Sequence, residues 1–296
     1  MAKLKNVILI LLISMGIIGC QTMTVKTQSP GTDQNVDNKE EMNSKAFFEN
    51  IRKGRTDKII QLLDAGMSPD IKDHSGSTAL QRAAEIGNRD IVRLLLDRGA
   101  EVNARGEDGE TALAEAVWNN DYDMSVLLLD QGSDPNIEFH SGGTALLDAA
   151  KQKDTKILER LLARGADTSL RDKHGKTALM DASRKGVSDN VRLLLEHGAD
   201  VNTRDNNRRT ALIYAAWFTS NETVKILLDS GAEVDVKDDA GKTPLMYAAW
   251  TGRIESVKTL FAHGADMHIK DKSGNTALMY AEREGHAGIV TILLNH

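Results

Sequence analysis

The only cysteine of the chain, Cys20, is the residue best placed for covalent chemistry. Its thiolate is a nucleophile, and it follows an apolar run from Val7 to Ile18 that is preceded by Lys3 and Lys5. An export signal consists of a positive start, about 12 mostly apolar residues and a small residue before the cleavage point. The apolar run is too short for a transmembrane helix, since about 20 apolar residues are needed to span a bilayer. A single cysteine also excludes a disulfide within the chain.

The four residues that end at Cys20 resemble the bacterial lipobox. They are Ile17-Ile18-Gly19-Cys20, in which aliphatic residues and a small residue precede the cysteine. The resemblance implies that residues 1–19 are a lipoprotein signal peptide and that the Cys20 thiol receives a diacylglycerol before cleavage. Acyl chains contribute about 0.8 kcal/mol per buried methylene, so two or three chains anchor a protein firmly. The alternatives are a membrane helix, or a plain cleaved signal with an incidental cysteine.

Residues 20–43 are predicted to be a flexible tether. The segment is polar, with Ser29-Pro30-Gly31 and a charged stretch around Lys39, and it has few apolar residues. Such a composition cannot bury enough surface to offset the entropy lost on ordering. The alternative is a structured extension of the first repeat. Together with the lipid on Cys20, the tether would hold the folded part at the bacterial cell membrane or the outer membrane, facing the periplasm.

Other catalytic or metal-binding chemistry has no counterpart in the sequence. The chain contains no Gly-x-x-x-x-Gly-Lys loop, no Gly-x-Ser-x-Gly and no His-Glu-x-x-His. His74, His140 and His174 fall near loop tips of different repeats, and equivalent positions in neighbouring repeats lie roughly 10 Å apart. Zinc ligands lie about 2 Å from one ion, so these histidines do not converge. We predict no catalytic residues, no metal site and no cofactor.

The rest of the chain is organised by a motif that recurs every 33 residues without insertion or deletion. A fixed period of this length is the mark of a stacked repeat protein. The seven copies begin Thr78-Ala79-Leu80, Thr111-Ala112-Leu113, Thr144-Ala145-Leu146, Thr177-Ala178-Leu179, Thr210-Ala211-Leu212, Thr243-Pro244-Leu245 and Thr276-Ala277-Leu278.

Each repeat predicts a tight turn followed by two short helices. In the first copy, the turn begins at Asp73, and Thr78 is placed to cap the first helix through its hydroxyl. Leu80, Ala83 and Ala84 give that helix a small apolar face, and Gly87 ends it. Residues 91–96 supply the apolar face of the second helix, which ends before a glycine suited to a left-handed cap, Gly99. Two such helices become stable only against neighbouring repeats.

The pattern Asp-x-x-Gly-x-Thr-[Ala/Pro]-Leu, then Ala-Ala, then Leu-Leu-Leu-x-x-Gly-Ala-Asp-x-Asn resembles the ankyrin repeat over about residues 44–296. The resemblance implies an all-α solenoid of helix pairs with β-hairpin fingers, in about eight units including the caps. Residues 44–72 would form an N-terminal capping repeat, residues 73–270 six regular repeats, and residues 271–296 a C-terminal capping repeat. The histidine that often follows Thr-Pro-Leu in this family is replaced, mostly by apolar residues that should pack between repeats: Gln81, Ala114, Leu147, Met180, Ile213, Met246 and Met279.

Partner contacts in ankyrin-like proteins come from the finger tips and the exposed end of the first helix. All three tryptophans of the chain fall at that helix end, as Trp118, Trp217 and Trp250, and Phe218 follows the second of them. Arg208 replaces the turn glycine of the adjacent finger, and Arg209 follows it. Aromatic residues and arginine are enriched in interface hot spots, so we predict these six residues as a partner-binding site. The alternative is that tryptophan here only covers the neighbouring helix. Tyr214, Tyr247 and Tyr280 are predicted to belong to the core.

The sequence therefore predicts a binding protein and not an enzyme. We expect a membrane-anchored protein–protein interaction module of the bacterial cell envelope that binds a partner on its concave finger and inner-helix face. Lysine and arginine number 37 against 43 acidic residues, a net charge of −6, which disfavours nucleic acid as a partner, and no small-molecule substrate is expected. The alternatives are an inhibitor or immunity-type protein for an envelope enzyme, and a secreted effector that binds host proteins.

Overall fold

The computed structural model of the protein describes residues 34–139, 142–219 and 221–295, with side chains from residue 42 onward. The predicted signal peptide, the Cys20 lipidation site and the first part of the predicted tether lie outside these residues. Residues 41–296 form one compact unit. Within the described residues, no helix is both long and apolar enough to cross a membrane.

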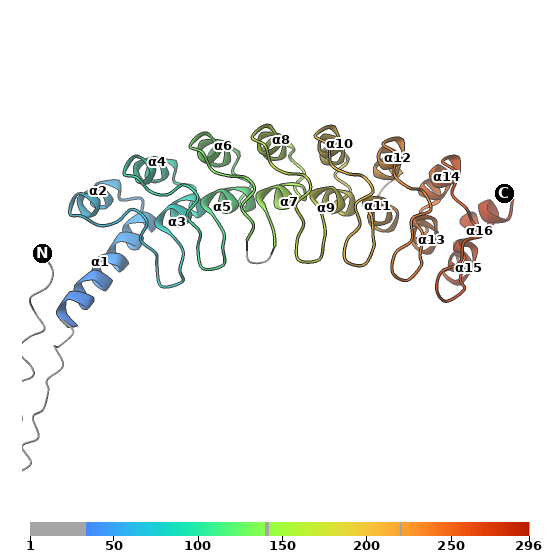
Figure 1. Cartoon of the computed structure of the whole chain (residues 1–296), viewed down its shortest axis with the longest axis horizontal. Coiled ribbons are helices and arrows are strands. Elements are labelled where there is room, and N and C mark those ends of the chain that lie inside the picture. Colours follow the sequence, from blue (N-terminus) through green and yellow to red (C-terminus); the bar gives the residue numbers. More distant parts are fainter. Residues whose placement is uncertain (1–33, 140–141, 220, 296) are drawn as a thin grey trace, which may run out of the picture. The chain divides into compact units, whose positions relative to one another are not determined.

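The described residues contain sixteen helices, joined by loops, that alternate between two layers (Figure 1). The inner helices, which follow the finger loops, are α3 (Ala79–Glu85), α5 (Ala112–Trp118), α7 (Ala145–Ala149), α9 (Ala178–Lys185), α11 (Ala211–Phe218), α13 (Pro244–Trp250) and α15 (Ala277–Arg283). The outer helices are α2 (Thr56–Asp64), α4 (Arg89–Asp97), α6 (Tyr122–Asp130), α8 (Lys156–Ala163), α10 (Ser188–Glu196), α12 (Asn221–Asp229), α14 (Ile254–Ala262) and α16 (Ala287–Leu294). Each inner helix packs against the inner helices of adjacent repeats and against its own outer helix, which is the predicted helical solenoid.

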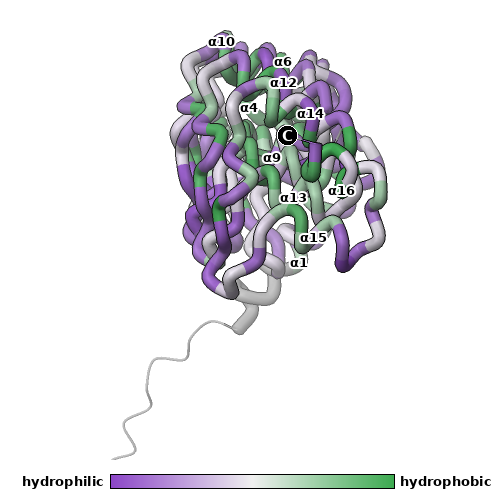
Figure 2. Tube along the Cα trace, turned by 90° about the vertical axis from the view of Figure 1, so that its right-hand side faces the viewer, coloured by the Kyte–Doolittle hydropathy of each residue, from purple (hydrophilic) through white to green (hydrophobic). Residues whose placement is uncertain are grey.

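Six of the seven threonines cap the inner helices as predicted, and in the described part of the chain Thr177 before α9 forms no such bond. The Thr78 hydroxyl accepts the backbone N–H of Gln81 at 3.1 Å, and the same bond forms in five later repeats, at Thr111, Thr144, Thr210, Thr243 and Thr276. Small residues behind the caps let the helices approach closely, since Ala83 and Ala84 are completely buried. In Figure 2 the hydrophobic stretches gather toward the middle of the stack and the hydrophilic ones toward its edges.

Helix α1 (Gln34–Arg52) differs from the predicted tether. Residues 34–43 were predicted to be flexible, and in the structure they are the first part of this helix. Lys39, Glu40, Glu41 and Met42 are good helix formers, and they lead directly into the segment whose Phe47 and Ile51 are fully buried. A helix nucleated by that packing extends backward at little cost, because propagation is easier than nucleation. For these ten residues the alternative, a structured extension of the first repeat, describes the structure better.

The finger loops are tight turns, and the described residues contain no β-strand. Backbone pairing of the β type is limited to one isolated bridge between Lys72 and Thr78. The short segments between the helices bond instead to the next repeat: the Asn103 side chain accepts the N–H of Asp134 at 2.9 Å and donates to the carbonyl of Gly132. Each finger turn is closed within itself, for example by the Asp205 N–H, which donates to the carbonyl of Arg209 at 2.9 Å. The predicted β-hairpin fingers stay unconfirmed.

The residues that replace the family's histidine pack as predicted at five positions. Ala114, Leu147, Met180, Ile213 and Met246 are no more than 2% exposed. Gln81 keeps a polar role, because its Nε2 donates to the carbonyl of Glu110 in the next repeat at 3.0 Å. Only Met279, in the last repeat, is exposed, at 47%, since no further inner helix covers it within the described residues.

Two inner helices lack the left-handed residue that ends the others. The repeat position just after the inner helix has a positive φ where it is occupied by Gly87, Asn120, Gly186, Gly252 and Gly285. After α7 the same position is Lys153, and after α11 it is Thr219, and neither has a positive φ. Side chains of the following repeats bind the carbonyls left free there. The Asn190 amide of α10 donates to the carbonyls of Ala149, Ala150 and Gln152 at 3.5, 3.1 and 2.8 Å, and Arg253 donates to those of Trp217 and Thr219 at 3.2 and 2.7 Å. Side chains of the next repeat also bind the ends of α3, α5 and α13, which keep the left-handed residue, but at α7 and α11 these side chains stand in for it.

Candidate partner-binding surface

Six aromatic rings from three consecutive inner helices form a stacked row, here called the aromatic ladder: Tyr214, Trp217, Phe218, Tyr247, Trp250 and Tyr280. At its centre Trp217 stacks on Phe218 and on Tyr247, with ring centroids 4.5 and 4.7 Å apart. Trp250 continues the row to Tyr280 at 5.9 Å. The rings meet because the 33-residue period places the same two positions of each repeat side by side.

Four cations from the finger loops and from α15 lie over these rings. The Arg209 guanidinium is 5.2 Å from the centroid of the Trp217 ring, and the Lys242 ammonium is 4.4 Å from that of Trp250. Lys176 lies 5.8 Å from the centroid of Tyr214, and Arg283 lies 4.9 Å from that of Tyr280. Cations at such distances are attracted by the negative faces of the rings, by about 0.5–2 kcal/mol each depending on exposure. Three of the four occupy one position of consecutive repeats, directly before the capping threonine.

The three tyrosines connect the ladder to the fingers. Their hydroxyls donate to the buried carboxylates of Asp205, Asp238 and Asp271 at 2.6, 2.7 and 2.6 Å. Burial, with the aspartate as a second cause, raises the pKa of both Tyr214 and Tyr280 to about 12, and it raises the pKa of Tyr247 as well. The tyrosines therefore remain neutral donors at physiological pH. Their predicted place in the core is confirmed, because they are only 2–4% exposed.

The ladder leaves part of its surface open to solvent. Phe218 is 44% exposed, and Trp217 and Trp250 are half-buried. Among the described residues no protein group accepts a hydrogen bond from the indole N–H of either tryptophan. These two donors are thus available to a ligand, next to a fixed hydrophobic surface.

The structure brings together four of the six residues predicted to bind a partner. Arg209, Trp217, Phe218 and Trp250 meet in the ladder, as just described. Trp118 lies three repeats away from Trp217, is 46% exposed, contacts Phe139 edge-on at 5.7 Å and donates its N–H to Asp148 at 2.6 Å. Within the described residues Arg208 contacts no ring of the ladder. It is exposed at a finger tip with a φ of 60°, the left-handed conformation that glycine has in the other fingers.

Sequence reasoning missed Lys176, Lys242 and Arg283. The signal for the two lysines was present, because the residue before the capping threonine is a cation in three consecutive repeats, Lys176, Arg209 and Lys242. Within a single repeat, the position before the capping threonine looks like an ordinary loop position. Its relation to the ladder depends on a tyrosine of the same or the next repeat, at a position that is tyrosine only in the last three repeats; Lys176, for example, lies over Tyr214 of the next repeat.

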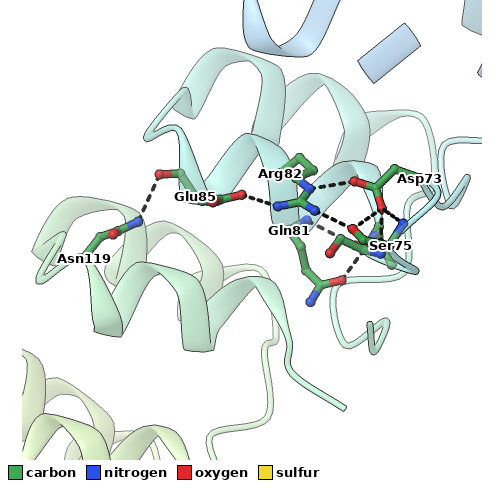
Figure 3. A network of polar contacts seen from close by, with 8 residues as sticks. Asp73, Ser75, Gln81, Arg82, Glu85 and Asn119 are labelled. Atoms are coloured by element: carbon green, nitrogen blue, oxygen red, sulfur yellow. Dashed lines mark hydrogen bonds and ion pairs between the residues drawn. The ribbon is translucent and has the colours of Figure 1, made fainter. Parts of the chain in front are cut away.

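The earlier repeats carry a different surface at the positions of the ladder, with carboxylates that are largely paired with cations. Arg82 stands where the later repeats have tyrosine, and it likewise bonds the finger aspartate, with its Nε 2.7 Å from the carboxylate of Asp73 (Figure 3). Its other nitrogens donate to Glu85 and to Ser75, both at 2.7 Å. The next three repeats have Glu115, Asp148 and Asp181 at the position of Arg82.

Glu115 is the one carboxyl of this surface, within the described residues, whose pKa is raised to about 7, by burial first and then by the charges of Glu85 and Glu110. The inner-helix surface of the early repeats therefore loses the negative charge of Glu115 as the pH falls through about 7. No group of three or more histidine, cysteine, aspartate or glutamate side chains in the described part of the chain is arranged to hold a metal ion.

Comparison with known proteins agrees with this architecture. The family model described as ankyrin repeats, in three copies, matches residues 47–139, 146–238, 207–271 and 234–296, which cover more than half of the chain. A search of curated proteins gives no match. Ankyrin repeats are protein–protein interaction modules. The chain therefore belongs to the ankyrin-repeat family.

Proposed function

We propose that this protein is a membrane-anchored protein–protein interaction module of the bacterial cell envelope, held by lipid on Cys20 and binding its partner on the finger and inner-helix face. The aromatic ladder is the single observation that carries the binding part of this proposal. It combines half-buried tryptophans, an exposed phenylalanine and arginine in one rigid surface. Such residues are the ones over-represented in interface hot spots.

Packing alone does not account for the ladder. A tryptophan that only covered its neighbour would be expected to find an acceptor for its N–H, as Trp118 does with Asp148. Trp217 and Trp250 have none among the described residues, and Phe218 next to them stays 44% exposed. Because solvent-exposed aromatic surface of this kind is costly to keep in water, it favours use in binding.

The partner arm of the proposal is tested with the full chain in cells. We expect Trp217→Ala combined with Trp250→Ala to lower the yield of cross-linked partner at least tenfold, because two anchors and their indole donors are removed together. Trp118→Ala is the matched control, a tryptophan at the same position of its repeat but outside the ladder, and it should change the yield less than twofold. Equal losses for both would refute the ladder as the binding site, provided circular dichroism shows each variant folded.

The membrane arm is tested separately by metabolic labelling with palmitate. The wild-type chain is expected to carry label and to sediment with membranes. Cys20→Ser should lose the label completely and leave the membrane fraction, because the serine hydroxyl does not replace the thiol as acceptor of the lipid. A labelled Cys20→Ser chain would rule out this anchor and leave the partner arm untouched.

A further inference from the structure

Two of the four cations of the aromatic ladder, Lys176 and Lys242, carry positive charge that no carboxylate of the described residues pairs, whereas Arg283 pairs with Glu284 at 3.1 Å. Lys176 and Lys242 contact only rings with their ammonium groups, and neither forms an ion pair among the described residues. Arg209 has a carboxylate only at 3.8 Å, from Asp238, whose oxygens already accept from Tyr247 and from two backbone N–H groups. In a chain of net charge −6, two unpaired lysines and a weakly paired arginine thus lie at one position of three consecutive repeats.

The rings add to the positive character of the surface. The faces of Trp217 are occupied by Phe218, Tyr247 and Arg209, and those of Trp250 by its ring neighbours and Lys242. A ring whose faces are occupied presents its edge, and the edge of an aromatic ring is the positive side of its quadrupole. Two free indole N–H groups lie on these edges. The surface therefore offers the two lysine ammonium groups and the two indole donors in apolar surroundings, whereas the carboxylates of Asp205, Asp238 and Asp271 next to it are buried and accept from the tyrosines.

We propose that the ladder binds an acidic, extended segment of the partner protein, with carboxylates facing Lys176, Arg209 and Lys242. This inference rests on the proposed function and names the chemistry of the partner. Equivalent residues of adjacent repeats lie roughly 10 Å apart. A peptide in the extended polyproline II conformation advances about 3.1 Å per residue with three residues per turn, so every third side chain lies on the same face. An acidic residue at every third position would therefore meet one cation in each of three consecutive repeats.

Other ligand classes fit this surface less well. A sugar stacks on a free ring face, and here the faces are occupied. A basic peptide would meet like charge. A nucleic acid needs many clustered cations to offset its phosphates, and the chain as a whole has a net charge of −6.

The test measures binding of a fluorescein-labelled 12-residue peptide, with glutamate at every third position and glycine and serine between, to the full chain in detergent. We expect fluorescence anisotropy to show saturable binding that weakens as salt increases. Lys176→Gln combined with Lys242→Gln should weaken it at least tenfold. Lys237→Gln combined with Lys270→Gln is the matched control, since it removes the same charge from two exposed lysines that contact no ring in the described part of the chain. It should change the affinity less than twofold.

Several outcomes would overturn the inference. They are an absence of peptide binding, equal effects of the two lysine pairs, and equal binding of the same peptide with lysine in place of glutamate. Binding of a single-stranded oligonucleotide or of phosphatidylglycerol vesicles, equally tight and equally sensitive to Lys176 and Lys242, would also overturn it in favour of a general polyanion site. If the peptide fails to bind while the tryptophan pair still abolishes cross-linking, the acidic partner is wrong and the proposed function stands.

Discussion

Replacing Asn190 with alanine is expected to lower the free energy of unfolding by about 3 kcal/mol, because it removes one buried donor from several backbone carbonyls at once. Asn190 is completely buried, and its Nδ2 is 3.1 Å from the carbonyl of Ala150 and 2.8 Å from that of Gln152. An unpaired buried acceptor costs about 1–3 kcal/mol. Chemical denaturation followed by circular dichroism measures the change. Hydrogen exchange should show that the largest loss of protection lies in α7 and α8.

Two further variants separate this role from simple packing. Asn190→Leu keeps the branched heavy-atom shape with larger methyl groups, and leucine resembles the residues at the same position of other repeats, Ile91, Ile157 and Ile289. It should still cost about 2 kcal/mol, somewhat less than alanine because it leaves no cavity. Both variants also remove an Oδ1 that has no partner among the described residues. Asn119→Ala removes a similar bond, to the carbonyl of Glu85, from an exposed site and should cost less than about 1 kcal/mol. A neutral Asn190→Leu would show that α7 needs no side-chain cap.

The second large effect is expected for Asp238→Ala, also about 3 kcal/mol. The Asp238 carboxylate accepts backbone N–H groups of Ala240 and Lys242, both at 2.9 Å, and the Tyr247 hydroxyl at 2.7 Å. Its loss leaves the hydroxyl without this acceptor and frees the turn that positions Lys242 over Trp250. We therefore expect tryptophan fluorescence to change in the folded variant, in addition to the lower stability seen by denaturation.

The neighbouring carboxylate supplies the control. Asp239→Ala removes the same charge from an exposed side chain and should cost less than about 0.5 kcal/mol. Asp238→Asn should fall between the two, because the amide oxygen still accepts the backbone N–H groups. If Asp238→Ala is as mild as Asp239→Ala, then the tyrosine and finger bonds contribute little to the stability of the repeats.

Periodicity made most of the fold predictable. A strict 33-residue spacing determines which residues lie beside each other in adjacent repeats, so the threonine caps, the buried tyrosines and the meeting of Trp217 with Trp250 follow from the sequence. The start of α1 did not follow. Its first residues are polar, and composition alone cannot tell a helix extended from a buried segment from a tether.

The candidate site was predictable only in part, for a similar reason. Trp118 shares the repeat position of Trp217 and Trp250, but its neighbours across the repeat are Asp148 and Phe139, which draw it into separate contacts. Lys242 belongs to the site because Tyr247 and Trp250 present rings to it. Whether a residue belongs to the site therefore depends on its partner in a different helix or loop. A pattern read from one repeat at a time does not show which partner that is.

The dependence of α7 on Asn190 and of α11 on Arg253 has a consequence for how this chain can evolve. Repeat arrays change by duplication, deletion and recombination of whole units, which presumes that the units are interchangeable. Here the end of α7, near Lys153, has its carbonyls bound only when the next repeat supplies the buried Asn190. The end of α11, at Thr219, likewise needs the repeat that supplies Arg253. The order of these repeats is therefore part of the inherited information, and this stretch of the array is expected to pass between lineages as a block.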